Sequence, residues 1–328
     1  MLNWLVFVPL RFLRWAFALA GALALLLTLM IATPLSHLPE LRSVSETARA
    51  VDRSTMPGLD HFTARDGTLL SYRHYRARGT ATGKIAILVH GSSGSSVAVH
   101  ALADALAGHG VETYAPDIRG HGSSGTRGDI AYLGQLDDDL ADLVAEIRKA
   151  APNAPLTLLG HSAGGGFVLR VASSPIKDQF ARTVLLAPYL GYDAPTNRPS
   201  GNWASPDIPR ILGLIVLHKL GIACCDALPT LAFAVPLDSA RILAATYSDR
   251  LMRNFATRGY KADLAAVTRP MTLIAGAEDE LMLSDKFADA VHAVAPNVDV
   301  KLIDGINHMQ IVSAPKAVAM IADDVATR

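Results

Sequence analysis

The sequence predicts an α/β fold in which a mostly parallel sheet carries helices on both faces. Apolar runs of strand length alternate with segments of helical periodicity from residue 84 to the C-terminus. Several runs are apolar almost without interruption, as in residues 84–89 (Lys-Ile-Ala-Ile-Leu-Val), which is typical of strands buried on both faces. Two of the strands run into glycine-rich turns, and in such sheets ligands bind at the carboxyl ends of the strands.

The expected elements follow one another in a regular order. Asp66-Gly67 is a favoured turn dipeptide and predicts an antiparallel hairpin before the parallel part of the sheet. The hairpin strands are expected at 61–65 and 69–75, later strands at 84–89, 111–118, 155–160, 183–187, 271–275 and 298–303, and helices at 99–107, 130–150, 283–294 and 315–326.

Residues 189–268 interrupt this alternation. A structureless loop of that length is uncommon in a compact domain, so the segment predicts a small helical insertion, with helical pieces at 208–220 and 240–255. Above the carboxyl edge of the sheet it would act as a lid that shapes an acyl or alkyl pocket. The alternatives are that it only packs over the sheet or forms a dimer surface.

The N-terminus has the features of a membrane anchor. Residues 15–36 carry no charge, and about 22 apolar residues cross ~30 Å of hydrocarbon as a helix. Arg11 and Arg14 precede the run, which places the N-terminus in the cytoplasm and the rest of the chain on the extracytoplasmic side. A cleaved signal peptide is the competing interpretation, but residues 31–35 offer a poor cleavage site. We expect an anchor at 1–36, a linker at 37–57 with a short helix near 43–53, and a catalytic domain at 58–328.

Composition excludes several other classes of protein. The 30 basic and 30 acidic residues cancel without forming a basic block, which argues against nucleic acid as a partner. The two cysteines, Cys224 and Cys225, are adjacent and match neither a disulfide framework nor a zinc pattern. A vicinal disulfide is conceivable, and two ordinary buried thiols are the favoured interpretation. Nothing in the sequence calls for a metal or an organic cofactor.

The sequence Gly160-His161-Ser162-Ala163-Gly164 lies between a predicted strand and a predicted helix. This is the setting of a nucleophile elbow, in which a strained turn exposes a serine hydroxyl at the N-terminus of a helix. The alternatives are a phosphate-binding turn or a plain turn. As a nucleophile, Ser162 needs a base, and the base needs a carboxylate that orients it.

Two later loops supply those partners in the expected chain order of serine, acid and histidine. Asp279 follows the strand at 271–275, and His308 follows the strand at 298–303. Both therefore reach the edge of the sheet where Ser162 lies. Glu278, Glu280 and Asp304 lie near Asp279 in the sequence and are alternative candidates for the acid.

An oxyanion that forms during acyl transfer needs two preorganised N–H donors. The elbow offers the backbone N–H of Ala163. The glycine-rich loop His90-Gly91-Ser92 after the strand at 84–89 offers a second, expected from Ser92. His90 and His161 are expected to serve in packing or hydrogen bonding, because one base is enough.

Residues 58–328 resemble the α/β-hydrolase superfamily, and within it the group of monoacylglycerol lipases, lysophospholipases and serine aminopeptidase-like hydrolases. Three stretches carry the resemblance: 90–94 (His-Gly-Ser-Ser-Gly), 117–125 (Asp-Ile-Arg-Gly-His-Gly-Ser-Ser-Gly) and 160–165 (Gly-His-Ser-Ala-Gly-Gly). The resemblance implies Ser162 as nucleophile, Asp279 as acid, His308 as base, and Ser92 with Ala163 as oxyanion donors.

Together these patterns predict a membrane-anchored serine hydrolase that cleaves a carboxylic ester, of lysophospholipid or monoacylglycerol type, through an acyl-enzyme. The alternatives are an aminopeptidase, thioesterase or acyltransferase with the same triad, and a membrane-tethered binding module without catalysis.

Overall fold

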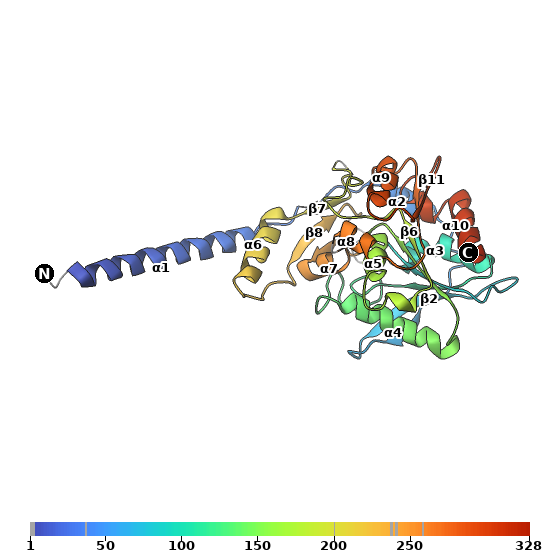
Figure 1. Cartoon of the computed structure of the whole chain (residues 1–328), viewed down its shortest axis with the longest axis horizontal. Coiled ribbons are helices and arrows are strands. Elements are labelled where there is room, and N and C mark those ends of the chain that lie inside the picture. Colours follow the sequence, from blue (N-terminus) through green and yellow to red (C-terminus); the bar gives the residue numbers. More distant parts are fainter. Residues whose placement is uncertain (1–3, 37, 200, 237–238, 240–241, 258) are drawn as a thin grey trace.

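A mixed sheet is the centre of the molecule (Figure 1). The structure, a computed structural model, describes the chain apart from residues 1–3, 37, 200, 237–238, 240–241 and 258. Those parts of the expected anchor, linker and insertion lie outside the described residues. Within the described chain the sheet has eight strands in the order β1-β2-β4-β3-β5-β6-β10-β11. The strands are β1 (Asp60–Thr63), β2 (Leu69–Tyr75), β3 (Ile85–Val89), β4 (Glu112–Pro116), β5 (Leu156–His161), β6 (Arg182–Leu186), β10 (Met271–Gly276) and β11 (Asp299–Ile303).

The pairing confirms the predicted α/β architecture. The strand β2 runs antiparallel to β1 and β4, and the pairs from β4 to β11 are parallel. All residues of β3, β5, β6 and β10 are buried, as their predominantly apolar sequences favour. The parallel strands therefore bring their carboxyl ends to one edge, where the loops after β3, β5, β10 and β11 meet.

Helices cover the sheet (Figure 1). The helix α3 (His100–Gly108) packs against α10 (Pro315–Thr327), while α5 (Ala163–Val171) packs on β5 and β6. The helix α4 (Gln135–Ala150) begins later than the predicted residue 130, because Gly134 has a φ of 99°, which ends any helical path from the N-terminal side. The helix α9 (Phe287–His292) and the short 3₁₀ turn before it occupy the predicted 283–294.

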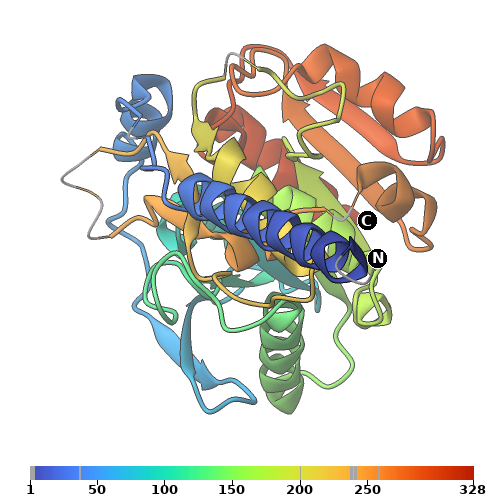
Figure 2. The ribbon, with the colours of Figure 1, turned by 90° about the vertical axis from the view of Figure 1, so that its left-hand side faces the viewer.

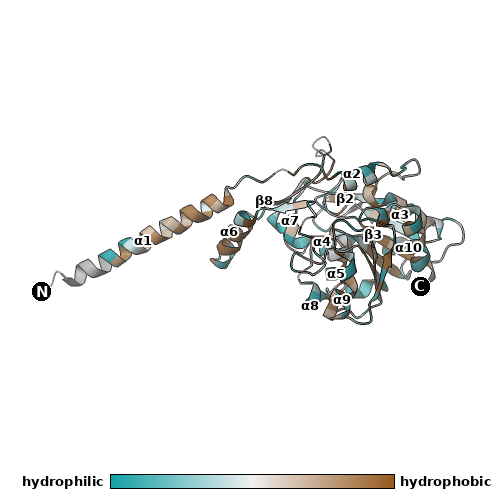
Figure 3. Ribbon diagram, turned by 90° about the horizontal axis from the view of Figure 1, so that it is seen from above, coloured by the Kyte–Doolittle hydropathy of each residue, from teal (hydrophilic) through white to brown (hydrophobic). Residues whose placement is uncertain are grey.

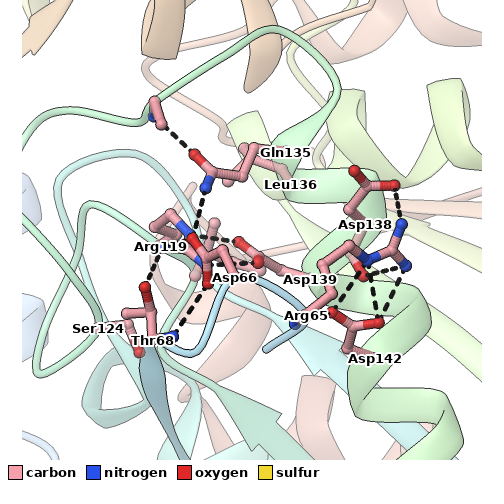
Figure 4. A network of polar contacts seen from close by, with 12 residues as sticks. Arg65, Asp66, Thr68, Arg119, Ser124, Gln135, Leu136, Asp138, Asp139 and Asp142 are labelled. Atoms are coloured by element: carbon pink, nitrogen blue, oxygen red, sulfur yellow. Dashed lines mark hydrogen bonds and ion pairs between the residues drawn. The ribbon is translucent and has the colours of Figure 1, made fainter. Parts of the chain in front are cut away.

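Charged side chains tie the hairpin turn to α4 (Figure 4). The guanidinium of buried Arg119 donates two 2.8 Å hydrogen bonds to the carboxylate of Asp139 and a further bond to Asp66. Arg65 pairs with Asp138 and Asp142 on the same helix. This network fixes the loop after β4, which runs close to the predicted site.

The segment between β6 and β10, called the cap below, differs from the prediction. Besides the helices α6 (Ile208–Lys219), α7 (Asp249–Asn254) and α8 (Tyr260–Ala265), it contains a second sheet of β7 (Ala204–Pro206), β8 (Pro229–Phe233) and β9 (Thr246–Ser248). The insertion is thus not purely helical. Residues 240–241 of the predicted helix at 240–255 lie outside the described residues, and 246–248 form a strand because they pair with β8.

The cysteine prediction was wrong in one respect. Cys224 and Cys225 are free thiols in the loop after α6, as expected, but both are exposed rather than buried.

The N-terminal helix α1 (Trp4–Ile31) extends away from the sheet (Figure 1) and stands in front of the cap in Figure 2. Its residues Arg11–Ile31 are long and apolar enough to cross a membrane, a property that signal sequences share, and only 6% of that apolar stretch is buried. The expected linker contains α2 (Arg42–Arg49), which buries Val44 in the main core, and the N–H of Leu41 donates to the carbonyl of Ala234.

Candidate active site

Ser162 occupies a sharp turn between β5 and α5. Its φ of 55° and ψ of −120° are strained for a residue with a side chain. The turn is possible because glycines flank it: a Cβ on Gly160 would lie 2.2 Å from the carbonyl oxygen of Gly164, and one on Gly164 would lie 2.3 Å from that of His90. Ser162 is 6% exposed and lines a pocket. The local geometry is that of a nucleophile elbow.

Asp279 and His308 come together after β10 and β11. The Nδ1 of His308 lies 2.8 Å from Oδ2 of Asp279, and both side chains are buried. The other carboxylate oxygen, Oδ1, accepts 2.8 Å hydrogen bonds from the backbone N–H groups of Leu281 and Met282. The neighbouring acids bind backbone instead, Glu280 at the N–H of His308 and Glu278 at that of Gly305.

These contacts set the charge of Asp279. Burial raises the pKa of this carboxyl, but the imidazole of His308 and the hydrogen bonds from His308, Met282 and Leu281 outweigh burial and lower the pKa below its ordinary value. An ionised Asp279 is suited to hold the Nδ1–H tautomer of His308, which leaves Nε2 free to accept a proton.

Ser162 and His308 line the same pocket, together with Ser92. The pocket wall draws on α2, the loop after β3, the elbow, the cap and the loops after β10 and β11. Its other lining residues carry no charge among those that the structure describes: Val44, Ser45, Ala48, Gly91, Ser93, Gly94, Ala98, His161, Trp203, Ala234, Val235, Pro236, Leu243, Leu281 and Met309. The pocket therefore offers an apolar cavity beside a serine and a histidine.

Of the two expected oxyanion donors, Ser92 lines this pocket and Ala163 directly follows Ser162. Ala163 is the first residue of α5, and Ser92 lies in the loop after β3, where a Cβ on Gly91 would be 3.2 Å from that of Ser162. In the described part of the chain, neither backbone N–H of Ser92 and Ala163 has a hydrogen-bond acceptor. Both donors are thus available to a bound ligand.

The cap holds the loop of Ser92 through three hydrogen bonds that sequence reasoning missed. The indole N–H of Trp203 donates to the Ser92 hydroxyl over 2.8 Å, and the backbone N–H of Ser93 donates to the Tyr247 hydroxyl over 2.7 Å. The N–H of Ala244 donates to the carbonyl of Ser93. Ser93 itself has a φ of 65°. No local pattern marks Trp203 or Tyr247, because the contacts join segments more than 100 residues apart.

Buried histidines line the inner side of the site. The Nε2 of His161 lies 3.1 Å from the carbonyl oxygen of His308, and the two rings are 4.8 Å apart. Burial, followed by the charge of His308, lowers the pKa of His161 to about 3. His90 bonds the carbonyl of Gly91 through Nδ1 and accepts the N–H of Ile118 at Nε2. Both histidines hold backbone in place, as expected.

Comparison with known proteins identifies the family of the chain. Residues 80–312, more than two thirds of the chain, match the family described as serine aminopeptidase, S33. The human monoglyceride lipase is 31% identical over 155 residues, which cover 47% of this chain and 49% of the relative. The chain thus spans about half the length of the curated relatives it matches. A monoglyceride lipase homologue of monkeypox virus is 23% identical over 68% of this chain and 81% of the relative.

Solved structures show the same fold. A soluble variant of monoglyceride lipase from Saccharomyces cerevisiae, solved with a substrate analogue, superposes with a TM-score of 0.61 at 19% identity, over 84% of this chain and 95% of the other. Monoacylglycerol lipase from Paleococcus ferrophilus gives a TM-score of 0.54 at 18% identity, over 79% and 98%.

Proposed function

The chain belongs to the serine aminopeptidase S33 family of α/β-hydrolases, and from this premise we propose that it cleaves a carboxylic ester through an acyl-enzyme at Ser162. Its similarity to monoglyceride lipases makes it an esterase- or lipase-like hydrolase. The observation that carries the proposal is the single pocket that Ser162 shares with His308, whose Nδ1 is bonded to Asp279.

In the proposed mechanism, Nε2 of His308 takes the proton of the Ser162 hydroxyl as its oxygen attacks the ester carbonyl. The backbone N–H groups of Ser92 and Ala163 stabilise the oxyanion, and each such donor contributes ~3 kcal/mol to the transition state. The tetrahedral intermediate then expels the alcohol, which receives the proton from His308. Water repeats the sequence on the acyl-enzyme and releases the acid. Asp279 stays ionised and stabilises the imidazolium.

The pocket lining supports a lipid-like acyl group. The described lining residues include Val235, Leu243 and Leu281 and no carboxylate. An aminopeptidase requires a partner for the substrate's ammonium group, because a buried cation without a counter-charge is costly. The lining therefore favours an ester of monoacylglycerol or lysophospholipid type over an aminoacyl amide. A thioesterase or an acyltransferase with the same triad is the second candidate, since either would use an apolar acyl pocket.

We also propose that α1 is a membrane anchor. It would place the N-terminus in the cytoplasm, because Arg11 and Arg14 precede the apolar stretch, and the hydrolase domain on the other side. Such an anchor suits a substrate taken from a bilayer.

A fluorophosphonate probe tests the nucleophile. The unmodified chain is expected to label, and Ser162→Ala is expected not to. Ser174→Ala, which removes a buried serine outside the pocket lining, is the matched control and should label like the parent. Equal labelling of Ser162→Ala and the parent would remove Ser162 from the mechanism. p-Nitrophenyl esters assayed beside aminoacyl-anilides then separate esterase from aminopeptidase activity.

A further inference from the structure

The cap helix α6 has two apolar faces. One is buried and contains Gly213, Leu214 and Leu217. The other is exposed and contains Ile208, Leu212, Ile215, and, just past the helix, Leu220 and Ile222. Ile208, Leu212 and Ile215 follow the i, i+4, i+7 spacing of a single stripe on a helix. We call these five exposed residues the α6 outer face. Clustered exposed aliphatic side chains of this kind mark an interaction surface.

The buried face of α6 packs against the end of α1. Leu27 of α1 forms a small core with Leu214 and Leu217. The helices approach closely at Gly213, where a Cβ would lie 3.3 Å from the Cβ of Met30. The arrangement is visible in Figure 1, where α6 lies beside the C-terminal end of α1.

Polar contacts also hold α6 to the end of α1, and this contact between the two helices is called the joint below. The Nε–H of Arg210 donates to the carbonyl of Ile31 over 2.8 Å, and its terminal nitrogen donates to that of Thr33. The Thr33 hydroxyl bonds the carboxylate of Asp207, which also accepts the backbone N–H of Arg210 and so caps α6. The carbonyl of Ile31, the last residue of α1, and that of Thr33 are thereby bonded by the cap. The direction in which α1 leaves the protein is set by α6.

The joint also fixes how deep α6 lies relative to the hydrocarbon core of the proposed membrane. The apolar stretch Arg11–Ile31 has 21 residues, and at 1.5 Å per residue it spans about 31 Å, close to the ~30 Å of a hydrocarbon core. Leu27 is four residues from the end of that stretch and lies about 6 Å from its boundary. The residues of α6 that pack on Leu27 therefore lie about 6 Å inside the edge of the hydrocarbon. In Figure 3 the C-terminal part of α1 and the middle of α6 both carry the hydrophobic colour.

We propose that the α6 outer face inserts into the boundary between headgroups and acyl chains of the bilayer that α1 crosses. The occupant is lipid, because α6 packs on Leu27 in the apolar stretch of α1 and its outer face is exposed beside that stretch. Exposed Lys219 continues the stripe of Ile208, Leu212 and Ile215 at the end of α6, and its long aliphatic stem lets the ammonium group reach the headgroups. The inference rests on the proposed anchor. The cap would thus be a second membrane contact, with the pocket wall held by the same segment.

The test uses the full chain in phosphatidylcholine vesicles, with Cys224→Ser and Cys225→Ser and one new cysteine carrying an NBD fluorophore. Ile215→Cys probes the outer face. Leu302→Cys is the matched control, because Leu302 on the edge strand β11 is 45% exposed against 43% for Ile215. Leu25→Cys, in the middle of α1, reports the anchor itself. Nitroxide-labelled phosphatidylcholine then serves as the quencher.

Quenching at residues 25 and 215 and none at 302 is the expected result. Quenching at 25 alone would overturn the proposal for α6 and leave the anchor intact. Absence of quenching at 25 would overturn both.

A second measurement separates function from folding. Ile208→Gln/Leu212→Gln/Ile215→Gln is expected to keep the hydrolysis of soluble p-nitrophenyl butyrate. Hydrolysis of an ester embedded in vesicles should fall about tenfold, which corresponds to about 1.4 kcal/mol of lost membrane contact. An equal fall on both substrates, or no fall on either, would contradict a membrane role for this face.

Discussion

His161 shows how burial controls the charge of a single residue in this site. It lies against His308, and its Nε2 hydrogen bond ends on a backbone carbonyl rather than a carboxylate. Among the described residues no counter-charge is in direct contact with the ring, so desolvation dominates and the neutral form is retained. His161 therefore contributes to acid sensitivity through stability, not through proton transfer.

The predicted consequence is a loss of stability on acidification. The pKa of His161 is about 3 in the folded chain and about 6.5 when unfolded, so the unfolded state binds the proton more readily between these values. The contribution is complete above pH 6.5 and declines as pH falls toward 3. His161→Gln should reduce the loss of unfolding free energy between about pH 7 and pH 4.5 by about 2–3 kcal/mol, measured by urea unfolding of the full chain in detergent. Exposed His109→Gln should leave that loss unchanged.

Tyr247 acts on the site from the cap. Its hydroxyl accepts the Ser93 N–H and contacts Nε2 of His121, and all three groups are buried. Tyr247→Phe leaves the Ser93 N–H without an acceptor and loosens the loop that presents Ser92. Because that loop would serve the transition state, kcat toward a soluble ester should fall about tenfold with KM nearly unchanged. Tyr192→Phe, on an exposed cap residue, is the control. A rise in KM alone would contradict a positioning role.

At the scale of elements, the elbow depends on close contact between β5, α5 and the loop after β3. Gly164→Ala would place a methyl group 2.3 Å from the carbonyl oxygen of His90, and backbone has no easy way to retreat. We expect a cost of about 3 kcal/mol, seen as a lower Tm, and loss of fluorophosphonate labelling. Gly58→Ala adds its Cβ where no atom lies within 4 Å and should match the parent. Equal Tm values for the two variants would refute the steric argument.

Elements of the central sheet were predictable because each carries a local signal. The strands β3, β5, β6 and β10 are predominantly apolar, and the hairpin has its turn dipeptide. The cap sheet was missed because β7 and β9 have three residues each and are stabilised by pairing with β8 rather than by their own sequence. The contribution of α2 to the pocket wall was missed for the same reason. Val44 lines the pocket together with Ala234 and Val235, and these residues come together only in the folded chain.

The candidate site was also predictable only where the local sequence carries a signal. Ser162, Asp279 and His308 were predictable from turns that follow strands, and the structure brings Asp279 to His308 and places His308 in the pocket of Ser162. Their catalytic roles stay predictions. Trp203 and Tyr247 needed the structure, since nothing in their neighbourhood distinguishes them from other aromatic core residues.

At the scale of the whole molecule, the orientation of the chain is open to a direct test. We expect the full chain to stay in the membrane pellet after alkaline carbonate extraction, with an intact N-terminus by mass spectrometry. Alkaline phosphatase fused after Arg328 should be active when the chain is expressed in a Gram-negative bacterium, because the fusion would reach the periplasm. A soluble product that has lost α1 would show that the helix is a signal sequence.

The joint between α1 and α6, which Arg210 holds, limits how far the domain can move from the membrane. An enzyme on a flexible linker reaches other membrane surfaces nearby. An enzyme whose membrane helix is fixed to its domain keeps the entrance of its active site at a constant distance from the bilayer. Under the proposed anchoring, this hydrolase would act only on the leaflet next to its domain. Inserting residues between α1 and the domain would move the active site away from its substrate.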